Sequence, residues 1–279
     1  MRRSTDWIRS AANADIPVPV DVDLTRPSIA RVYDYVLGGK DNFAVDRNAA
    51  QSLMSAVPEV PVMARDNRDF LRRAVRYLVA EAGIRQLIDI GSGLPTVRNV
   101  HEIAHDENPG TRVVYADIDP VVLSHGRVLL ADNDNTTVIT ADVRRADSVF
   151  DNPGLTGFID QTQPFAVLLS GVLHHLSDAE DLPRVTADIR GRMPSGSYLV
   201  VTNFLDDGSR RARELENAFL TGGLGTGRFR TREEQNGYFH GLDLIDPGLV
   251  RVNDWRPDPQ TRRDSPVNGL YVGGVARKP

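Results

Sequence analysis

Apolar residues in the N-terminal quarter of the chain recur with the spacing of amphipathic helices. One helical face has members at i, i+3, i+4 and i+7, namely Ile29, Val32, Tyr33 and Val36. Ser28 can cap this helix, and Gly38-Gly39 can end it. A longer apolar stripe predicts a second helix over 66–82. Residues 1–24 show no such period and are expected to form an N-terminal arm, and residues 25–65 a helical cap.

Beyond residue 83 the pattern changes to short apolar runs that alternate with helical stretches. The runs lie at 87–90, 113–116, 137–140, 165–170 and 198–202. Strands that alternate with helices, such as those expected over 97–104 and 121–130, favour a parallel sheet covered on both faces. Two later runs, 242–245 and 270–275, would add a final hairpin and make seven strands. The sequence therefore predicts an α/β domain over 66–279, with a mostly parallel sheet and a final antiparallel strand.

Composition narrows the classes of function. The chain has 279 residues, of which 41% are apolar and 25% charged, as expected for one large globular α/β unit. It contains no cysteine, which excludes disulfides, thiolate metal ligands and cysteine nucleophiles and fits a cytoplasmic location. The net charge is −5 and no basic stripe is present, so we expect no nucleic-acid partner. No long apolar run follows Arg2 and Arg3, so neither a secretory signal nor a membrane span is expected.

The strongest local motif is a strand followed by a glycine turn, L-I-D-I-G-S-G-L-P-T over 87–96. Gly91 and Gly93 allow positive φ and a close approach of the backbone to a ligand. A dinucleotide fingerprint needs a third glycine where Thr96 stands, which argues against an NAD-dependent oxidoreductase. Asp89 suits a cationic or hydroxyl-bearing ligand better than a pyrophosphate. The alternative interpretation is a plain tight turn, with Thr96 as the cap of the next helix.

Acidic residues also follow the next two strands. Asp117 lies 24 residues after Gly93, close to the spacing of about 20 at which an acid meets ribose hydroxyls in dinucleotide-binding folds. Asp119, followed by Pro120, can instead cap the next helix, and both roles are compatible. Asp142 follows the third strand and could accept a hydrogen bond from an adenine amino group. Taken alone, Asp142 is only a loop aspartate.

A fourth motif, S-G-V-L-H-H-L over 170–176, places paired histidines after the fourth strand. Together, the four motifs at successive strand ends resemble those of the class I S-adenosylmethionine-dependent methyltransferases. The resemblance implies a Rossmann-like methyltransferase sheet with S-adenosylmethionine as cofactor. By position it implies cofactor contacts from Asp89, Gly91 and Gly93 for the methionine part, Asp117 for ribose, Asp142 for adenine, and the neighbouring Ile118, Val143 and Ser170. The family's usual third glycine is Pro95 here, which alters the turn.

The segment P-S-I-A-R-V-Y-D-Y-V-L-G-G-K-D-N-F over 27–43 is similar to the N-terminal signature of one actinobacterial family. That family was first described as a domain of unknown function and later as S-adenosyl methyltransferases. The resemblance implies that this segment closes over the cofactor as a lid, with Tyr33, Lys40, Asp41 and Asn42 toward cofactor or substrate. In the alternative interpretation, Asp41 and Asn42 cap a turn and Tyr33 packs a helix.

His174 and His175 are the candidate catalytic residues, because histidine is a natural general base near neutral pH. In the family this segment often only shapes the cofactor pocket, so both roles stay open. The predicted function is methyl transfer to an unidentified small molecule. The alternative is a non-catalytic sensor of S-adenosylmethionine or S-adenosylhomocysteine. The sequence shows no metal-binding spacing, and an exposed edge of the final hairpin could pair two chains.

Overall fold

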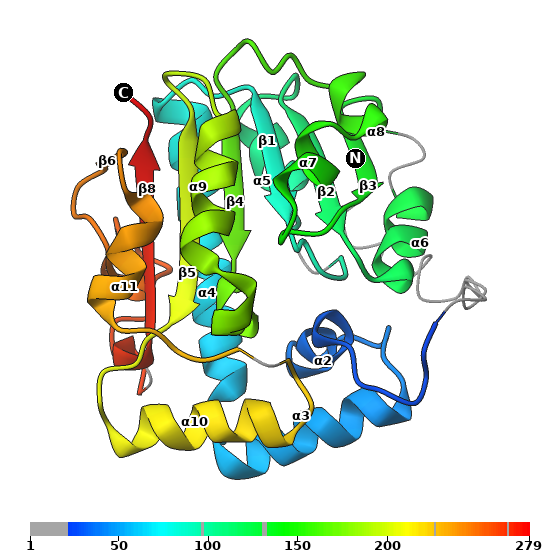
Figure 1. The fold of residues 1–279 in the computed structure, drawn as a ribbon, viewed down its shortest axis with the longest axis vertical. Coiled ribbons are helices and arrows are strands. Elements are labelled where there is room, and N and C mark those ends of the chain that lie inside the picture. The colour runs from blue at the N-terminus through cyan, green and yellow to red at the C-terminus, as the bar shows by residue number, and fades with distance from the viewer. Residues whose placement is uncertain (1–21, 96–97, 130–132, 226, 267) are drawn as a thin grey trace.

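A computed structural model describes residues 22–95, 98–129, 133–225, 227–266 and 268–279 (Figure 1). Helices cover both faces of a central sheet, and another group of helices lies across one end of the strands. The strands are β1 (Gln86–Ile90), β2 (Arg112–Asp117), β3 (Thr136–Thr140), β4 (Ala166–Ser170), β5 (Tyr198–Phe204), β6 (Asp243–Leu244), β7 (Val250–Arg251) and β8 (Tyr271–Arg277). Most of the predicted arm over 1–24 lies outside the described residues.

The helices fall into two groups by position. Those across the carboxyl ends of the parallel strands are α2 (Ile29–Val36), α3 (Ala44–Ala56), the start of α4 (Val60–Arg76) and α10 (Arg210–Thr221). The remaining helices are α5 (Val100–Glu107), α6 (Pro120–Leu129), α7 (Ala146–Phe150), α8 (Pro153–Thr156), α9 (Leu182–Arg192) and α11 (Arg232–Asn236). In Figure 1, α7 and α9 lie in front of the sheet, and α4 and α5 lie behind it.

The sheet separates two hydrophobic cores because successive strand residues point to opposite faces. In β1, Leu87 belongs to the core under α4 and α5, whereas Ile88 belongs to the core under α7 and α9. In β4, Leu168 and Val167 divide in the same way. Every residue of β1 and β5 is buried. Continuous apolar strands of this kind are expected when both faces of a parallel sheet are covered.

The strand order is β3-β2-β1-β4-β5-β8-β6, and β7 also pairs with β8. The first five strands are mutually parallel, and β8 runs antiparallel to β5 over its whole length. This confirms the predicted α/β class, with a mostly parallel sheet and a terminal antiparallel strand. Among the described residues the sheet has eight strands, not the predicted seven. β6 lies within the run predicted over 242–245, and the additional strand is β7, which also pairs with β8.

Two predicted helix boundaries were displaced. The helix predicted over 66–82 is α4, which begins at Val60 because Pro61 is tolerated in a first turn, where its missing N–H would have no partner anyway. It ends in a π turn, Tyr77–Glu81, and runs across the predicted boundary at residue 65. The helix predicted over 97–104 is α5, whose N-cap is Asn99 in a capping box; Thr96 lies outside the described residues.

The described residues contain neither a helix suited to a membrane nor a clustered set of metal ligands. No described helix has the length and apolar character that crossing a lipid bilayer requires. Within the same residues, no group of three or more His, Asp or Glu side chains is arranged to hold a metal ion.

Candidate functional site

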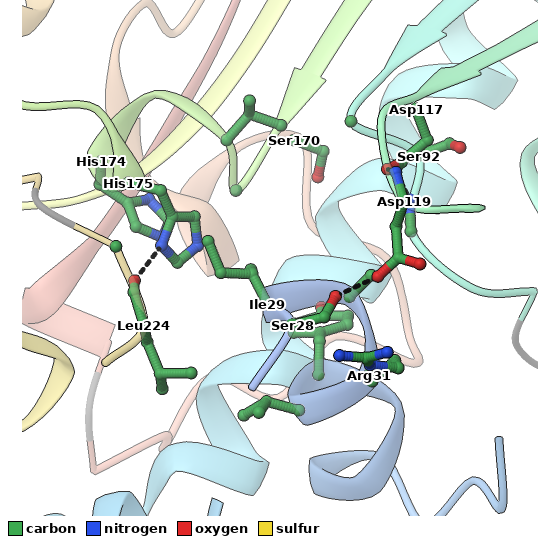
Figure 2. A pocket seen from close by; sticks show the side chains of 18 of the residues that line it. Ser28, Ile29, Arg31, Ser92, Asp117, Asp119, Ser170, His174, His175 and Leu224 are labelled. Carbon is green, nitrogen blue, oxygen red and sulfur yellow. Dashed lines mark hydrogen bonds between the residues drawn. The ribbon is translucent and has the colours of Figure 1, made fainter. Parts of the chain in front are cut away.

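A cavity of about 650 Å³ lies between the carboxyl ends of the parallel strands and the helices that cross them. Its size falls in the range of small-molecule pockets, and its place is where open α/β sheets bind ligands. We call the part over β1, β2 and β3 the acidic half; it is lined by Asp89, Asp117, Asp119 and Asp142. The part over β4, β5 and β8 is the aromatic half, lined by His174, His175, Phe204, Phe219 and Tyr271. Figure 2 shows the two sides facing each other.

The glycine turn after β1 forms the floor of the acidic half. Gly91 and Gly93 have φ values of +69° and +67°, which L side chains rarely adopt. A Cβ atom on Gly91 would lie only 2.7 Å from Cγ2 of Val172, so this position also needs glycine for space. The amide of Gly91 donates to the carbonyl oxygen of Ala116 at 2.7 Å, which ties the turn to β2. The hydroxyl of Ser92 is buried there and has no described partner.

Asp117, at the end of β2, holds two segments together. Its carboxylate accepts hydrogen bonds from the backbone amides of Gly93 at 2.8 Å, Ile118 at 2.7 Å and Asp119 at 2.9 Å. Burial raises its pKa. The next acid, Asp119, accepts from the amide of Val121 at 2.8 Å, and so caps the start of α6. Ile118 is 59% exposed and lines the rim of the cavity.

Asp89 is the least compensated acid of the site. Its side chain is 4% exposed, and none of the described residues donates a hydrogen bond to it. Burial raises its pKa to about 7, with the positive charge of Arg68 opposing this shift and the negative charge of Asp117 adding to it. A buried carboxylate without a partner is costly, so this position fits a ligand that brings a positive charge or hydrogen-bond donors.

Asp142 and Val143, after β3, also line the acidic half. The Asp142 carboxylate is already paired with Arg144, whose Nε and Nη2 donate at 2.8 and 2.7 Å. Arg144 also approaches Glu180 at 3.6 Å. The prediction of an adenine contact by Asp142 did not include this bidentate pair. A ligand amino group at Asp142 would therefore share the carboxylate with Arg144.

The two histidines lie in the aromatic half, with ring centroids 4.3 Å apart. His175 Nδ1 is 3.2 Å from the carbonyl oxygen of Leu224, as the dashed line in Figure 2 marks. A carbonyl oxygen only accepts, so Nδ1 carries the proton and Nε2 keeps its lone pair. Burial lowers the pKa of His175 to about 4. Burial, together with the neighbouring His175, also lowers the pKa of His174 well below its usual range. Both rings are therefore neutral near pH 7.

Asn67 of α4 is a lining residue that the sequence analysis missed. Its Oδ1 accepts from the hydroxyls of Ser170 at 3.1 Å and Thr202 at 2.7 Å. Its Nδ2 donates to the hydroxyl of Tyr33 at 3.3 Å, which in turn donates to the carbonyl oxygen of Ala64 at 3.0 Å. The available signal was a polar residue one helical turn before Phe70 and Leu71, within the apolar stripe of the helix.

Of the four residues expected to face cofactor or substrate from the N-terminal segment, only Tyr33 lines the cavity. Asp41 and Asn42 surround Asp34, whose carboxylate accepts from the Asp41 amide at 2.9 Å and the Asn42 side chain at 2.8 Å. Lys40 is exposed beside this turn. The structure thus does not bring these three residues together with the acids of the cavity. Instead, the hydroxyl of Ser28 reaches the carboxylate of Asp119.

Comparisons with known proteins give matches over almost the whole chain. A family model described as S-adenosyl methyltransferase matches residues 17–279. The chain is similar to a protein from Thermobifida fusca YX described as a candidate methyltransferase, with 44% identity, 92% of this chain and 96% of that chain covered, and a TM-score of 0.87. It is also similar to a DUF574 family protein from Streptomyces avermitilis MA-4680, with 36% identity, coverage of 91% and 98%, and a TM-score of 0.86.

A more distant solved structure shares the fold. An O-methyltransferase family protein from Burkholderia thailandensis is 15% identical, with 88% of this chain and 63% of that chain covered and a TM-score of 0.51. This likeness concerns the fold alone, which is the Rossmann-like methyltransferase fold that the sequence predicts. The search of curated proteins gave no match.

Proposed function

We propose, from the premise that the chain belongs to the S-adenosyl methyltransferase family, that it transfers a methyl group from S-adenosylmethionine to a small molecule bound in the same cavity. The observation that carries this proposal is the division of the cavity. Four acids, of which Asp89 and Asp117 are buried, gather over β1 to β3, and a second space lined by neutral rings adjoins them over β4, β5 and β8. A cofactor and an acceptor molecule therefore have separate places within one enclosure.

The residues of the acidic half fit the cofactor. The carboxylate of Asp89 would receive the ammonium group of the methionine part, which relieves its unpartnered burial. The nearby Arg68 guanidinium lines the same region and would bind the methionine carboxylate. Asp117 would accept from the ribose hydroxyls. Asp142 and Val143 would contact the adenine, with Ile118 packing at the rim and the main chain at Gly91 and Gly93 lying close to the ligand.

The cofactor supplies an activated methyl group, and the protein supplies alignment and exclusion of water. Because the sulfonium charge disappears in the transition state, a carboxylate close to sulfur would favour the ground state and slow the transfer. The lining residues of β4, β5, α10 and β8 are Ser170, Phe204, Phe219 and Tyr271, none of which is charged. Ser170 lies where the two halves meet, and the uncharged surface beyond it suits the reacting atoms.

We propose His175 as the residue that accepts a hydrogen bond and then a proton from the acceptor. Its Nδ1 is committed to the Leu224 carbonyl, so its unprotonated nitrogen is Nε2. His174 packs against it and is held by Asn203 at 3.2 Å. The low pKa of both rings makes them weak bases. That weakness is the observation that favours the second candidate function, a sensor of S-adenosylmethionine or S-adenosylhomocysteine without catalysis.

One experiment distinguishes these functions. The protein is titrated calorimetrically with S-adenosylmethionine and S-adenosylhomocysteine, and is then incubated with S-adenosylmethionine and a pooled small-molecule extract. Binding together with formation of S-adenosylhomocysteine above a protein-free control supports the enzyme. Binding without turnover in any extract supports the sensor. Folded protein that binds neither compound contradicts both functions.

A further inference from the structure

We infer that the methyl acceptor is a flat, uncharged aromatic molecule whose hydroxyl group faces His175; this inference rests on the proposed function and specifies the substrate class of the same site. The inference comes from the aromatic half, which is lined mainly by rings, whereas the acidic half is lined by carboxylates. Three properties of that lining carry it: its rings, its lack of charge, and the unprotonated Nε2 of His175.

The rings form a continuous cluster around the end of the cavity. Phe204 contacts His174 with centroids 4.5 Å apart, Tyr271 at 4.6 Å and Phe219 at 5.3 Å. Phe219 also contacts His175 at 5.7 Å. Aromatic faces and edges at these separations attract further rings by stacking and edge-to-face contacts. A planar ligand that enters the cavity from the acidic half therefore meets ring surfaces over β4, β5 and β8.

The opposite wall is aliphatic and comes from the cap helices. α2 contributes Val32 and Val36, α3 contributes Leu53, and α4 contributes Met63 and Leu71, all of which line the cavity and are buried. A ligand between this wall and the ring cluster has apolar atoms on both sides. The favourable contribution of such a site grows with the apolar area that the ligand buries. A thin, flat molecule suits a space with one aromatic and one aliphatic wall.

Charged acceptors are disfavoured by what the aromatic half lacks. From Ser170 to Leu176, and among the lining residues of β5, α10 and β8, the described side chains carry no charge, because the low pKa of both histidines keeps them neutral. Glu180, the nearest lining acid in sequence, lies by Arg144 and accepts from Ser177 at 2.7 Å. A buried carboxylate or ammonium group on the acceptor would meet no charged side chain among these lining residues, and such burial is costly.

The orientation of His175 selects a hydroxyl. Its Nε2 offers a lone pair, so the acceptor must present a donor such as O–H. In the transfer, the hydroxyl oxygen forms the bond to the methyl carbon while the carbon–sulfur bond breaks and its electron pair stays on sulfur. The hydroxyl proton passes to Nε2 of His175 and then to solvent. The products are a methyl ether, S-adenosylhomocysteine and one proton, so atoms and charges balance.

The test uses matched probes on the full chain saturated with S-adenosylhomocysteine. Naphthol is the neutral hydroxyl probe; naphthoate and naphthylmethylammonium carry the same rings with a charge. We expect naphthol to bind at least about tenfold more tightly than either charged probe, since a charge buried without a partner costs at least the ~1.4 kcal/mol that a tenfold difference requires. When S-adenosylmethionine replaces S-adenosylhomocysteine, we expect naphthol to be converted to methoxynaphthalene, which mass spectrometry detects.

Two variants test whether naphthol binds in the aromatic half of the cavity. Ala64 lines the cavity, and Ala64→Phe should fill the aromatic half and abolish naphthol binding while binding of S-adenosylhomocysteine persists. Ala56→Phe, the same change at an exposed position of α3, should bind naphthol normally. If Ala64→Phe does not fold, Phe219→Leu removes a ring at nearly constant volume and should weaken naphthol severalfold.

The outcomes separate the two levels of the proposal. If the protein binds S-adenosylhomocysteine but not naphthol, or binds a charged probe more tightly, the inference about the acceptor is overturned and the proposed function stands. Undiminished naphthol binding by a folded cavity variant also overturns it, because the probe then binds elsewhere. If S-adenosylhomocysteine itself fails to bind, the proposed function falls and the inference falls with it.

Discussion

The carboxylate of Asp117 accepts a hydrogen bond from the backbone amide of Gly93, 2.8 Å away, and thereby joins the end of β2 to the turn that follows β1. The two positions are far apart in sequence, yet they meet because β1 and β2 are parallel neighbours with Ile90 opposite Ala116. A single side chain thus shapes the floor of the acidic half and faces the proposed ribose position.

Replacement of Asp117 by alanine should therefore remove both the hydrogen bond to the glycine turn and the proposed contact to ribose. We expect Asp117→Ala to lose at least about a hundredfold in affinity for S-adenosylmethionine, since it removes two charge-assisted contacts worth about 1.5–3 kcal/mol each. Calorimetric titration measures this loss. Asp151→Ala, which removes an exposed partner of Arg192, is the control and should bind normally. An Asp117→Ala protein with unchanged affinity would place the ribose elsewhere.

Asp89 should make cofactor binding depend on pH. Its pKa of about 7 means that the carboxyl group is largely protonated in the free protein at acidic pH, and an ammonium group binds the ionised form. Binding then releases a proton, so affinity should rise by up to about tenfold per pH unit from about pH 5 to pH 7 and level off above it. Titrations in several buffers measure the slope. Asp89→Asn should bind weakly at every pH, with a flat profile; a flat profile in the wild type would argue against the ammonium contact.

The raised pKa of Asp89 also predicts how the free energy of unfolding changes with pH. The raised pKa means that the folded state binds more protons at Asp89 than the unfolded state between about pH 4 and pH 7. Its contribution to the free energy of unfolding therefore falls as pH rises through this window. The cofactor-free Asp89→Asn protein should be more stable than the wild type above pH 7 in urea denaturation, and the difference should shrink toward pH 4.

Gly91 and Gly83 offer a matched test of the glycine turn. Both have positive φ, but a Cβ atom on Gly91 would lie 2.7 Å from Val172, whereas on Gly83 it would meet nothing within 4 Å. Gly83→Ala should cost only the backbone strain of about 1 kcal/mol. Gly91→Ala adds an overlap worth about 1–3 kcal/mol and should also weaken cofactor binding. Thermal unfolding and titration measure both effects, and equal losses in the two variants would mean that Val172 moves aside freely.

Asn67 should stabilise the fold, because it joins Tyr33 of α2 to Ser170 of β4 and Thr202 of β5. Asn67→Ala leaves the hydroxyls of Ser170 and Thr202 without their common acceptor, which should cost about 1–3 kcal/mol of unfolding free energy. The control is Asn217→Ala on the exposed face of α10, which should change stability by less than about 0.5 kcal/mol. A similar small effect of Asn67→Ala in chemical denaturation would show that water replaces the lost acceptor at no cost.

Ser28 should hold the N-terminal segment over the site. Its hydroxyl bonds to Asp119, and its amide donates to Asp46 at 2.9 Å. Ser28→Ala removes the first bond only, so amides of α2 should exchange with solvent more quickly while those of β1 stay protected. Hydrogen exchange measured by mass spectrometry shows this directly. Ser55→Ala on α3 is the control, and unchanged exchange in α2 would mean that other contacts hold the segment.

Local patterns predicted the acids at strand ends because parallel strands bring their carboxyl ends to one edge of the sheet. Asp89, Asp117 and Asp142 accordingly line one cavity. The insertion of β8 between β5 and β6 could not be predicted in the same way. Strand order depends on contacts between distant segments, which local periodicity does not record.

The hydrogen-bond partners of polar side chains were the other feature that the sequence could not predict. The sequence left two roles open for the K-D-N segment, part of a lid or a capped turn, and Asp41 and Asn42 bond to Asp34 within their own turn. Short-range partners of this kind compete with a ligand for the same polar atoms. Conversely, Asn67 belongs to no recognisable motif, and its importance comes from Ser170 and Thr202, which are far away in the chain.

The position of β8 sets an order of events during synthesis. β5 is mostly apolar and fully buried, but its outer neighbour in the sheet is made only after residues 205–270 have been translated. Until β8 emerges from the ribosome, the nascent sheet presents β5 as an open hydrophobic edge, which is a template for aggregation and a target for chaperones. Tyr271 arrives with β8, so the ring cluster is completed last, and a ribosome-bound chain ending before it holds an unfinished cavity.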